Sequence, residues 1–191
     1  MKKKALVGFF SISILVIAAT VYGKRGQEIR PAPKRKPVSA AEPVPEQIVY
    51  SSFFHLVVNV KQQADETRSS GKNAASLDSY FQKHIGLDND QARLLNDIAD
   101  QCVAGVAVKD ELAQRIIINF RSKFPNGRVP KGTKLPPPPP ELAGLQQERN
   151  AIILKARDNL LASLGESGTN KVKNYIAANI ASNIKPIPLQ K

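Results

Sequence analysis

The sequence is poor in the residues that build metal and redox centres. Its 191 residues include one cysteine, Cys102, two histidines, His55 and His84, and no tryptophan. A single cysteine excludes an intramolecular disulfide and any cluster of several cysteine ligands. Neither histidine has a second one four residues away, so we expect no metal site and no cofactor. We interpret both histidines as structural and Cys102 as a small buried hydrophobe.

Aromatic residues are also scarce, at 6% of the chain. Strand-rich folds rely on aromatic and β-branched residues, and no segment alternates apolar and polar residues over a useful length. Apolar residues recur instead at steps of three and four, as one face of a helix requires. The expected fold class is therefore all-α: a four- or five-helix bundle or an extended helical hairpin. An N-terminal apolar helix and a disordered tether rich in proline and lysine are expected to precede it.

Acidic residues are nearly absent from the first part of the chain. Residues 1–41 contain nine lysines and arginines against one acidic residue, Glu28, and so carry +8 of the formal net charge of +12. The rest of the chain carries only +4. A nucleic-acid-binding domain concentrates positive charge on the fold itself. We therefore expect no nucleic-acid partner, and instead a protein or an envelope polymer; no small-molecule substrate is indicated.

The N-terminus has the pattern of an export signal or a membrane anchor, at residues 1–23. Three lysines, at 2–4, precede an uncharged apolar run at residues 5–22. The run is long for a cleavable signal and short for a spanning helix. Gly23 permits cleavage, whereas bulky Tyr22 favours retention, so both interpretations stay open. Both predict an exported, periplasmic or otherwise extracytoplasmic protein, either secreted or tethered to the inner membrane.

Residues 24–45 are expected to form a linker. Their five prolines remove backbone donors and favour an extended chain, and they include little apolar mass to bury. Within this linker, Lys34, Arg35 and Lys36 form a candidate contact to anionic headgroups or an acidic wall polymer. A solvated spacer that makes no such contact is the alternative interpretation.

A helical domain is expected at residues 46–185, followed by a tail at 186–191. It contains a proline-rich loop at 125–140, in which Pro140 is placed to open the next helix. Apolar residues of the first helix form one stripe: Val49, Phe53, Leu56, Val57 and Val60.

Two signals mark the long segment at residues 89–124. Asp88 and Gln91 have the spacing of a capping box, which predicts a helix start. Gly105 predicts a kink or break inside the segment, because glycine has low helix propensity. Whether the segment forms one helix or two is left open by the sequence.

The most regular helix is expected at residues 141–164. Gly165 is expected to end it, residues 166–169 to form a loop, and a last helix to extend to Ile184. The expected core contacts join Ile152, Ile153 and Leu160 of this helix to Ile98, Ile116 and Phe120 of the long segment.

Two segments approach catalytic motifs, and neither completes one. Residues 165–169 read Gly-Glu-Ser-Gly-Thr, which lacks the final glycine of a nucleophile elbow and joins two helices instead of a strand and a helix. Residues 70–73 contain a Gly-Lys pair without the other residues of a phosphate-binding loop. We therefore predict a non-enzymatic binding protein with no catalytic residues. An enzyme whose site assembles only in three dimensions and a structural spacer are the alternatives.

The segment Gly86-Leu87-Asp88-Asn89-Asp90-Gln91 resembles the Leu-Thr-x-x-Gln signature of Spy/CpxP-like periplasmic helical proteins. Leu87 and Gln91 match, and Asp88 replaces the threonine as a helix N-cap. A second copy would be expected near residues 164–168, where glycines replace both the threonine and the glutamine. The resemblance implies a helical hairpin of the cell envelope that acts as a chaperone or as a stress or metal sensor, without catalysis. The family's metal-binding histidines have no counterpart here.

Overall fold

The computed structural model describes residues 44–129, 132 and 136–184, and these residues fold as helices without a strand. The all-α prediction is confirmed for this part of the chain. The expected signal or anchor, the candidate contact residues Lys34, Arg35 and Lys36, and the tail lie outside the described residues. Within the described residues, no helix combines the length and the hydropathy needed to cross a bilayer.

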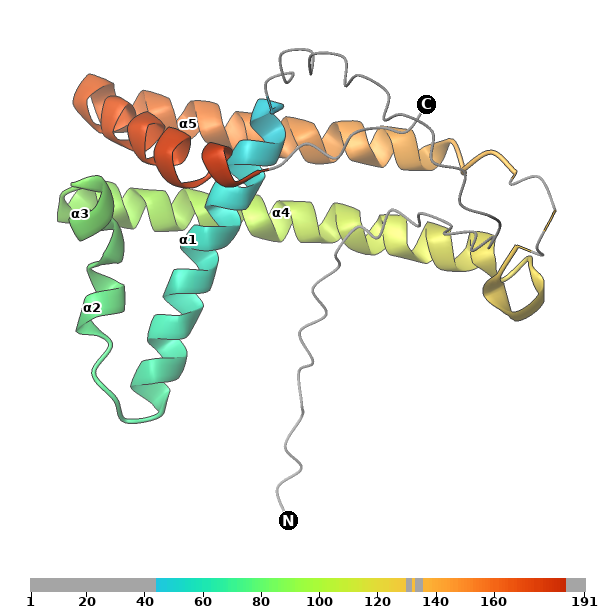
Figure 1. Ribbon diagram of the computed structural model, residues 1–191, viewed down its shortest axis with the longest axis horizontal. Coiled ribbons are helices and arrows are strands. Elements are labelled where there is room, and N and C mark those ends of the chain that lie inside the picture. The colour runs from blue at the N-terminus through green and yellow to red at the C-terminus, as the bar shows by residue number, and fades with distance from the viewer. Residues whose placement is uncertain (1–43, 130–131, 133–135, 185–191) are drawn as a thin grey trace, which may run out of the picture. The chain divides into compact units, whose positions relative to one another are not determined.

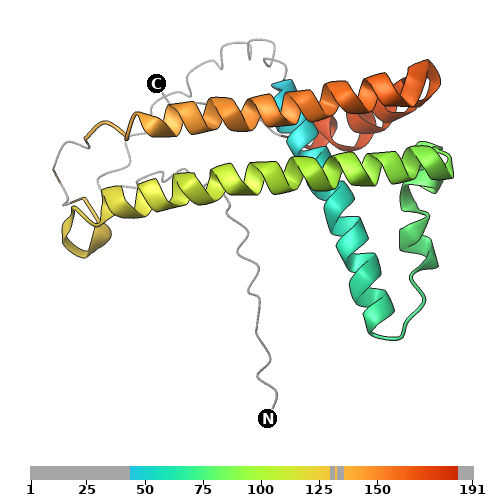
Figure 2. The ribbon, with the colours of Figure 1, turned by 180° about the vertical axis from the view of Figure 1, so that it is seen from behind.

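Five α-helices and two short 3-10 turns follow one another in the described residues. They are α1 (Glu46–Ser69), α2 (Ala75–Asp78), α3 (Tyr80–Ile85), α4 (Asn89–Arg121), η1 (Pro125–Gly127), α5 (Glu141–Asn179) and η2 (Ala181–Asn183). The long helices α4 and α5 run side by side in opposite directions, and α1 crosses them (Figures 1 and 2).

The first helix supplies the third layer of the core. The predicted stripe on α1 is confirmed, because Val49, Phe53, Val57 and Val60 are buried and Leu56 is partly buried. This face contacts both α4 and α5 where α1 crosses them. Three layers of helix are therefore present over one part of the α4–α5 pair.

The capping box at the start of α4 is confirmed. The Asp88 carboxylate accepts a hydrogen bond from the Gln91 amide at 2.8 Å, and the Gln91 side-chain oxygen accepts one from the Asp88 amide at 3.2 Å. Gly86 ends α3 in the left-handed conformation, with φ of +79°. This turn lets α4 leave at an angle to α3, so that α4 can lie along α5 (Figure 1).

The break expected at Gly105 is wrong, since α4 is one continuous helix of 33 residues. Gly105 faces α5, because a methyl group there would lie 3.4 Å from the Ile152 side chain, an ordinary van der Waals contact. The propensity cost of an interior glycine is about 1 kcal/mol, which the packing of α4 on α5 outweighs. The glycine marks a contact, not an interruption.

The break at Gly165 is confirmed, but the loop after it is wrong. Gly165 has non-helical torsions (φ +67°, ψ −178°), and helix resumes directly after it, so α5 is kinked there. The Thr169 hydroxyl donates to the Leu161 carbonyl at 2.8 Å, across the kink.

At the other end of α5, Pro140 occupies the position before the first helical residue, one residue earlier than expected. After the kink, α5 ends at Asn179, and η2 replaces the expected extension of the helix.

The core is one cluster shared by α1, α3, α4 and α5. Ile153 and Leu160 are fully buried, and Ile98 and Ile152 pack against the cluster as expected. Ile116 and Phe120 do not belong to it, which corrects the prediction. On α4 the cluster ends at Val106, before either residue, because the crossing by α1 covers only that part of the helix pair (Figures 1 and 2).

Candidate functional site

Beyond the core, α4 and α5 continue as a pair that no other described helix covers. We call residues 107–128 and 141–152 the arm, and the rest of the described residues the body. No residue of the arm is buried, although many are apolar. Three of the four large, exposed hydrophobic residues of the described chain lie in it: Val108, Leu112 and Ile118. The arm is therefore the part of the described surface where apolar side chains are most exposed.

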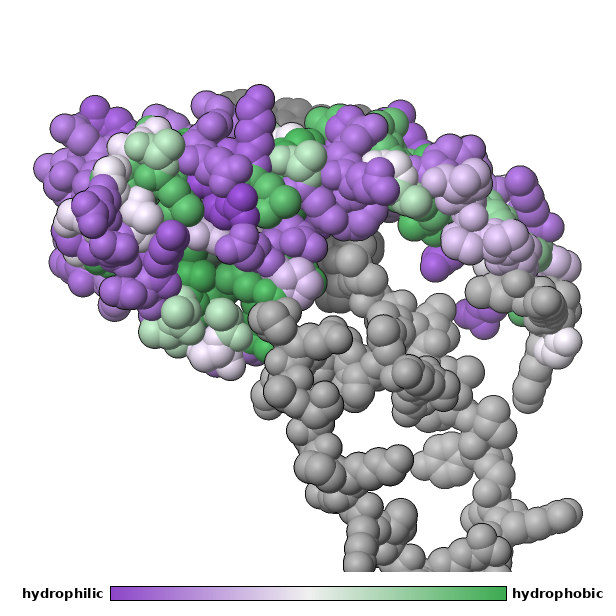
Figure 3. All heavy atoms as spheres, turned by 90° about the horizontal axis from the view of Figure 1, so that it is seen from above, coloured by the Kyte–Doolittle hydropathy of each residue, from purple (hydrophilic) through white to green (hydrophobic). Residues whose placement is uncertain are grey.

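The apolar side chains between the two helices of the arm are only partly shielded from water. Ile116, Ile117 and Phe120 of α4, with Leu142 and Leu145 of α5, are all partly exposed. Two helices alone cannot enclose a side chain, because each apolar face needs a further layer against it. Seen from above, apolar patches interrupt the hydrophilic surface over the body and over the arm at the right of the view (Figure 3).

Two ion pairs join α4 to α5 at the base of the arm. Lys109 lies 2.6 Å from Glu148, and the Arg149 Nε lies 3.1 Å from Asp110. The side chains of Lys109 and Arg149 are only 28% and 22% exposed, so water screens these pairs less than ordinary surface pairs. We call these four residues the clasp, because they fix the spacing of the two helices where the core ends.

His55 of α1 is next to the clasp. Its pKa is lowered, first by partial burial and then by the positive charge of Arg149, while Asp110 acts in the opposite direction. The His55 side chain is exposed, and it belongs to no group of three metal-binding side chains among the described residues. His55 is therefore within electrostatic reach of Arg149 and Asp110 in the clasp, at the junction of body and arm.

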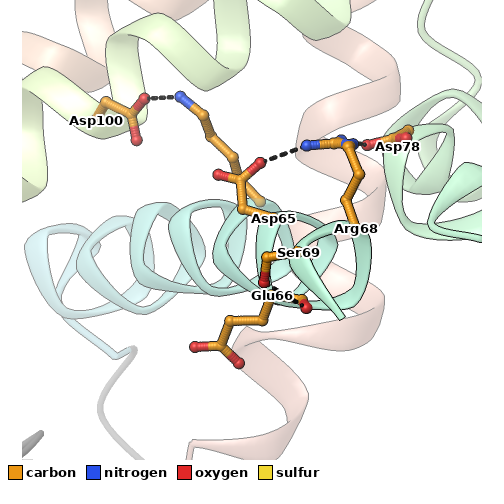
Figure 4. Close-up of polar contacts among 7 residues, drawn as sticks. Asp65, Glu66, Arg68, Ser69, Asp78 and Asp100 are labelled. Atoms are coloured by element: carbon orange, nitrogen blue, oxygen red, sulfur yellow. Dashed lines mark hydrogen bonds and ion pairs between the residues drawn. The ribbon is translucent and has the colours of Figure 1, made fainter. Parts of the chain in front are cut away.

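A second polar region lies at the other end of α1 (Figure 4). Arg68 bridges Asp65 and Asp78, at 2.7 Å from each, and Lys61 pairs with Asp100 of α4. A hollow of about 200 Å³ is lined by Lys61, Asp65, Arg68 and Asp78, and its apolar wall includes Val60, Ala64, Leu77 and Phe81.

The charges around this hollow are all used in ion pairs. Asp65, Asp78 and Asp100 each accept from a cation, and the ion pairs join the end of α1 to α2 and α4. The Ser69 hydroxyl donates to the Glu66 carbonyl at 2.9 Å and closes the last turn of α1. A general acid or base needs a group that can exchange a proton with a substrate. This arrangement instead holds the α1–α2 turn in place.

The remaining candidate residues, Cys102, His84 and Ser167, lie in surroundings that suit a structural role. Cys102 is buried, as predicted, and burial raises the pKa of its thiol to about 11, which keeps it protonated and unreactive. The His84 ring stacks on Tyr80, with centroids 4.3 Å apart. Ser167, in the near-miss elbow, lies in a helical segment on the surface. Among the described residues, no three His, Cys, Asp or Glu side chains gather as a metal site would require.

The motif at residues 87–91 meets the kink of α5. Leu87 is buried, and the Gln91 side-chain amide donates to the Leu164 carbonyl at 3.5 Å. Gly168 fits against both, since a methyl group there would lie 2.9 Å from Leu164 and 3.0 Å from Gln91. Lys171 donates to the Gly86 carbonyl at 2.8 Å. The structure thus brings the motif against the segment where a second copy was expected.

Sequence reasoning missed the arm as a candidate site. The signal for it was present, because Ile118 is an apolar residue two positions from both Ile116 and Phe120, and so falls outside the helical stripe that contains them. An apolar residue on the outer side of a helix has no place in a two-helix contact.

Comparisons of the chain with protein-family models, with curated proteins and with solved structures find no match.

Proposed function

We propose that this chain is an exported, non-enzymatic protein, anchored by residues 5–22 and carried on the linker at 24–45, that binds a partner protein through the arm. The supporting observation is that α4 and α5 continue past the core with exposed apolar residues, and that no other helix of the described residues covers them there. In the body, α1 covers the same two helices. A helix of the partner would take the corresponding position on the arm.

The chemistry of the partner follows from the outer side of α4. Val108 and Leu112 lie one turn apart, and they are 56% and 39% exposed. Removing an apolar side chain from water contributes roughly 1.5–3 kcal/mol of favourable free energy, so a partner that covers these residues forms a more stable complex. An amphipathic helix with apolar residues at steps of three and four fits such a surface. We expect the partner to present one.

Photo-crosslinking in living cells tests the site. A photoreactive amino acid at Leu112 should give a defined crosslinked product, and the same amino acid at Ala162, exposed on the body helix α5, should not. The double variant Val108→Glu, Leu112→Glu should abolish the product without lowering the melting temperature, because neither side chain is in the core. Its matched control is Asn159→Glu, Ala162→Glu. Equal products from both probe positions would refute the arm as the binding site.

Three measurements test the rest of the proposal. A reporter fused after residue 45 should be active outside the cytoplasm, and mass spectrometry of the native protein should find an intact N-terminus. A mature N-terminus near Lys24 would show that residues 1–23 are cleaved, so that the protein is released instead of anchored. If the purified protein turns over a substrate in a broad hydrolase screen, and changing one residue abolishes that turnover, the protein is an enzyme and the non-enzymatic proposal is refuted.

A second candidate function is a periplasmic chaperone or stress sensor of the Spy/CpxP-like type. The packing of the residue 87–91 motif on residues 164–168 favours it. A chaperone of this kind would suppress the aggregation of several unrelated unfolded proteins at once. The partner-specific protein proposed above would not.

A further inference from the structure

The far end of the arm combines two aromatic rings with three cations. Phe120 and Phe124 contact each other edge to face, with centroids 5.4 Å apart, and both are partly exposed. Arg121, Lys123 and Arg128 are neighbours of these rings in the sequence, and all three are exposed. We call these five residues the tip.

The positive charges of the tip are not neutralised by carboxylates of the described residues. None of the three forms an ion pair with a carboxylate among the described residues, in contrast to Lys109, Arg115 and Arg149 further along the arm. The sequence explains this, because residues 112–140 contain no aspartate or glutamate. The tip is therefore a net positive surface that attracts an anionic ligand.

The geometry of the chain presents this surface outward. Asn126 and Gly127, with φ of +54° and +66°, turn the chain sharply directly after Phe124. The continuous helix α4 connects the tip to the body, and at 1.5 Å per residue its 33 residues extend about 50 Å. The side chains of the tip therefore lie far from the body, at the end of a stiff support.

We infer that the tip binds the surface of an anionic phospholipid bilayer. Phenylalanines between lysines and arginines are the combination by which interfacial segments enter the boundary between headgroups and acyl chains. The cations select anionic headgroups. The phenylalanine pair favours a bilayer over a hydrated acidic polymer, because only the bilayer offers an apolar phase to the rings.

This inference rests on the proposed anchoring of the chain at a membrane. A linker of some twenty residues, fully extended at about 3.1 Å per residue, reaches roughly 60 Å. That reach allows the arm to return to the bilayer that holds the anchor. Binding at both ends would hold the body against the membrane, with the outer side of the arm available to the partner.

The absence of tryptophan from the chain provides a direct test. The variant Phe124→Trp places a single indole at the tip, and Phe124 lies outside the core, so the fold should be preserved. The full-length variant is reconstituted in vesicles of phosphatidylcholine alone, or of phosphatidylcholine and phosphatidylglycerol in equal parts. The anchor holds the protein in both, so only the charge of the surface differs.

We expect the indole emission to shift to shorter wavelength in the phosphatidylglycerol vesicles and not in the neutral ones. Adding Arg121→Gln, Lys123→Gln and Arg128→Gln should weaken the interaction about a hundredfold, since three surface cations are lost. The matched control, Lys83→Gln, Lys155→Gln, Lys173→Gln, removes the same charge from exposed positions on the body and should retain the shift. The variant Phe120→Trp repeats the measurement one turn away.

Three outcomes would overturn the inference. They are equal emission in both vesicle types, equal loss of the shift in the tip and control triple variants, and a shift caused by soluble polyglutamate but not by vesicles. The last outcome would assign the tip to an acidic polymer. A native N-terminus found near Lys24 would refute the anchoring without changing the vesicle result, so the two proposals can fail separately.

Discussion

The same two helices, α4 and α5, run through both the body and the arm, yet the two regions differ in how far their side chains are buried. In the body, α1 covers the pair, and Leu95, Ile153 and Leu160 have no exposed surface. In the arm no described helix covers it, and no residue is buried. Stability therefore resides in the body, whereas the arm displays a surface. The difference comes from the third layer, since both regions have apolar residues.

The largest expected effect comes from comparing truncations in the two regions. Leu160→Ala removes a fully buried side chain of the body and should lower the free energy of unfolding by about 2–5 kcal/mol. Ile116→Ala removes a partly exposed side chain of the arm and should lower it by less than about 1 kcal/mol. Urea unfolding followed by circular dichroism measures both. Similar losses would show that the arm shares the core.

Two glycines at the contacts of α4 with α5 sharpen the comparison. Gly168→Ala, in the body, places a methyl group 2.9 Å from Leu164 and should lower the free energy of unfolding by about 1–3 kcal/mol. Gly105→Ala, where the arm begins, places one at 3.4 Å from Ile152, in ordinary contact, and gains up to about 1 kcal/mol of helix propensity. Thermal melts should rank Gly105→Ala at or above the wild type and Gly168→Ala below it. The opposite order would contradict the packing at both sites.

The sequence was sufficient for the elements whose causes are local. The Asp88–Gln91 capping box and the break at Gly165 depend on neighbouring residues and were predicted correctly. The break at Gly105 was predicted wrongly, because the packing of α4 on α5, whose residues are distant in the sequence, keeps the helix continuous there. Propensity describes one helix, whereas the fit of two helices is a tertiary property.

The candidate site was harder to predict for the same reason. The periodic stripe identifies Ile116 and Phe120 as apolar but does not say whether another helix covers them. That depends on where α1 crosses, which no local pattern encodes. The clasp was equally hidden, since Lys109–Glu148 and Asp110–Arg149 join residues 39 positions apart.

A smaller effect is expected from the clasp. Lys109→Gln with Arg149→Gln should lower the free energy of unfolding by only about 1 kcal/mol per pair, as partly exposed ion pairs do. Amide hydrogen exchange should nevertheless accelerate in residues 107–121, because α4 is no longer held to α5 there. Arg115→Gln, which breaks a pair within α4, is the control and should leave exchange in the arm nearly unchanged. Faster exchange throughout α1 instead would mean that the clasp supports the body.

The smallest effect concerns pH, at the junction of the two regions. The pKa of His55 is lowered in the folded protein by partial burial and by Arg149, so folding disfavours the protonated imidazole. The unfolded chain then binds a proton more readily, and stability must fall as the pH drops through the ordinary histidine pKa of about 6.5. Above that pH both states are neutral, and His55 contributes no pH dependence. Melting temperatures measured between neutral and mildly acidic pH should therefore decrease less in His55→Gln than in the wild type. A wild-type slope in His55→Gln would show that the junction of arm and body is not the acid-sensitive point.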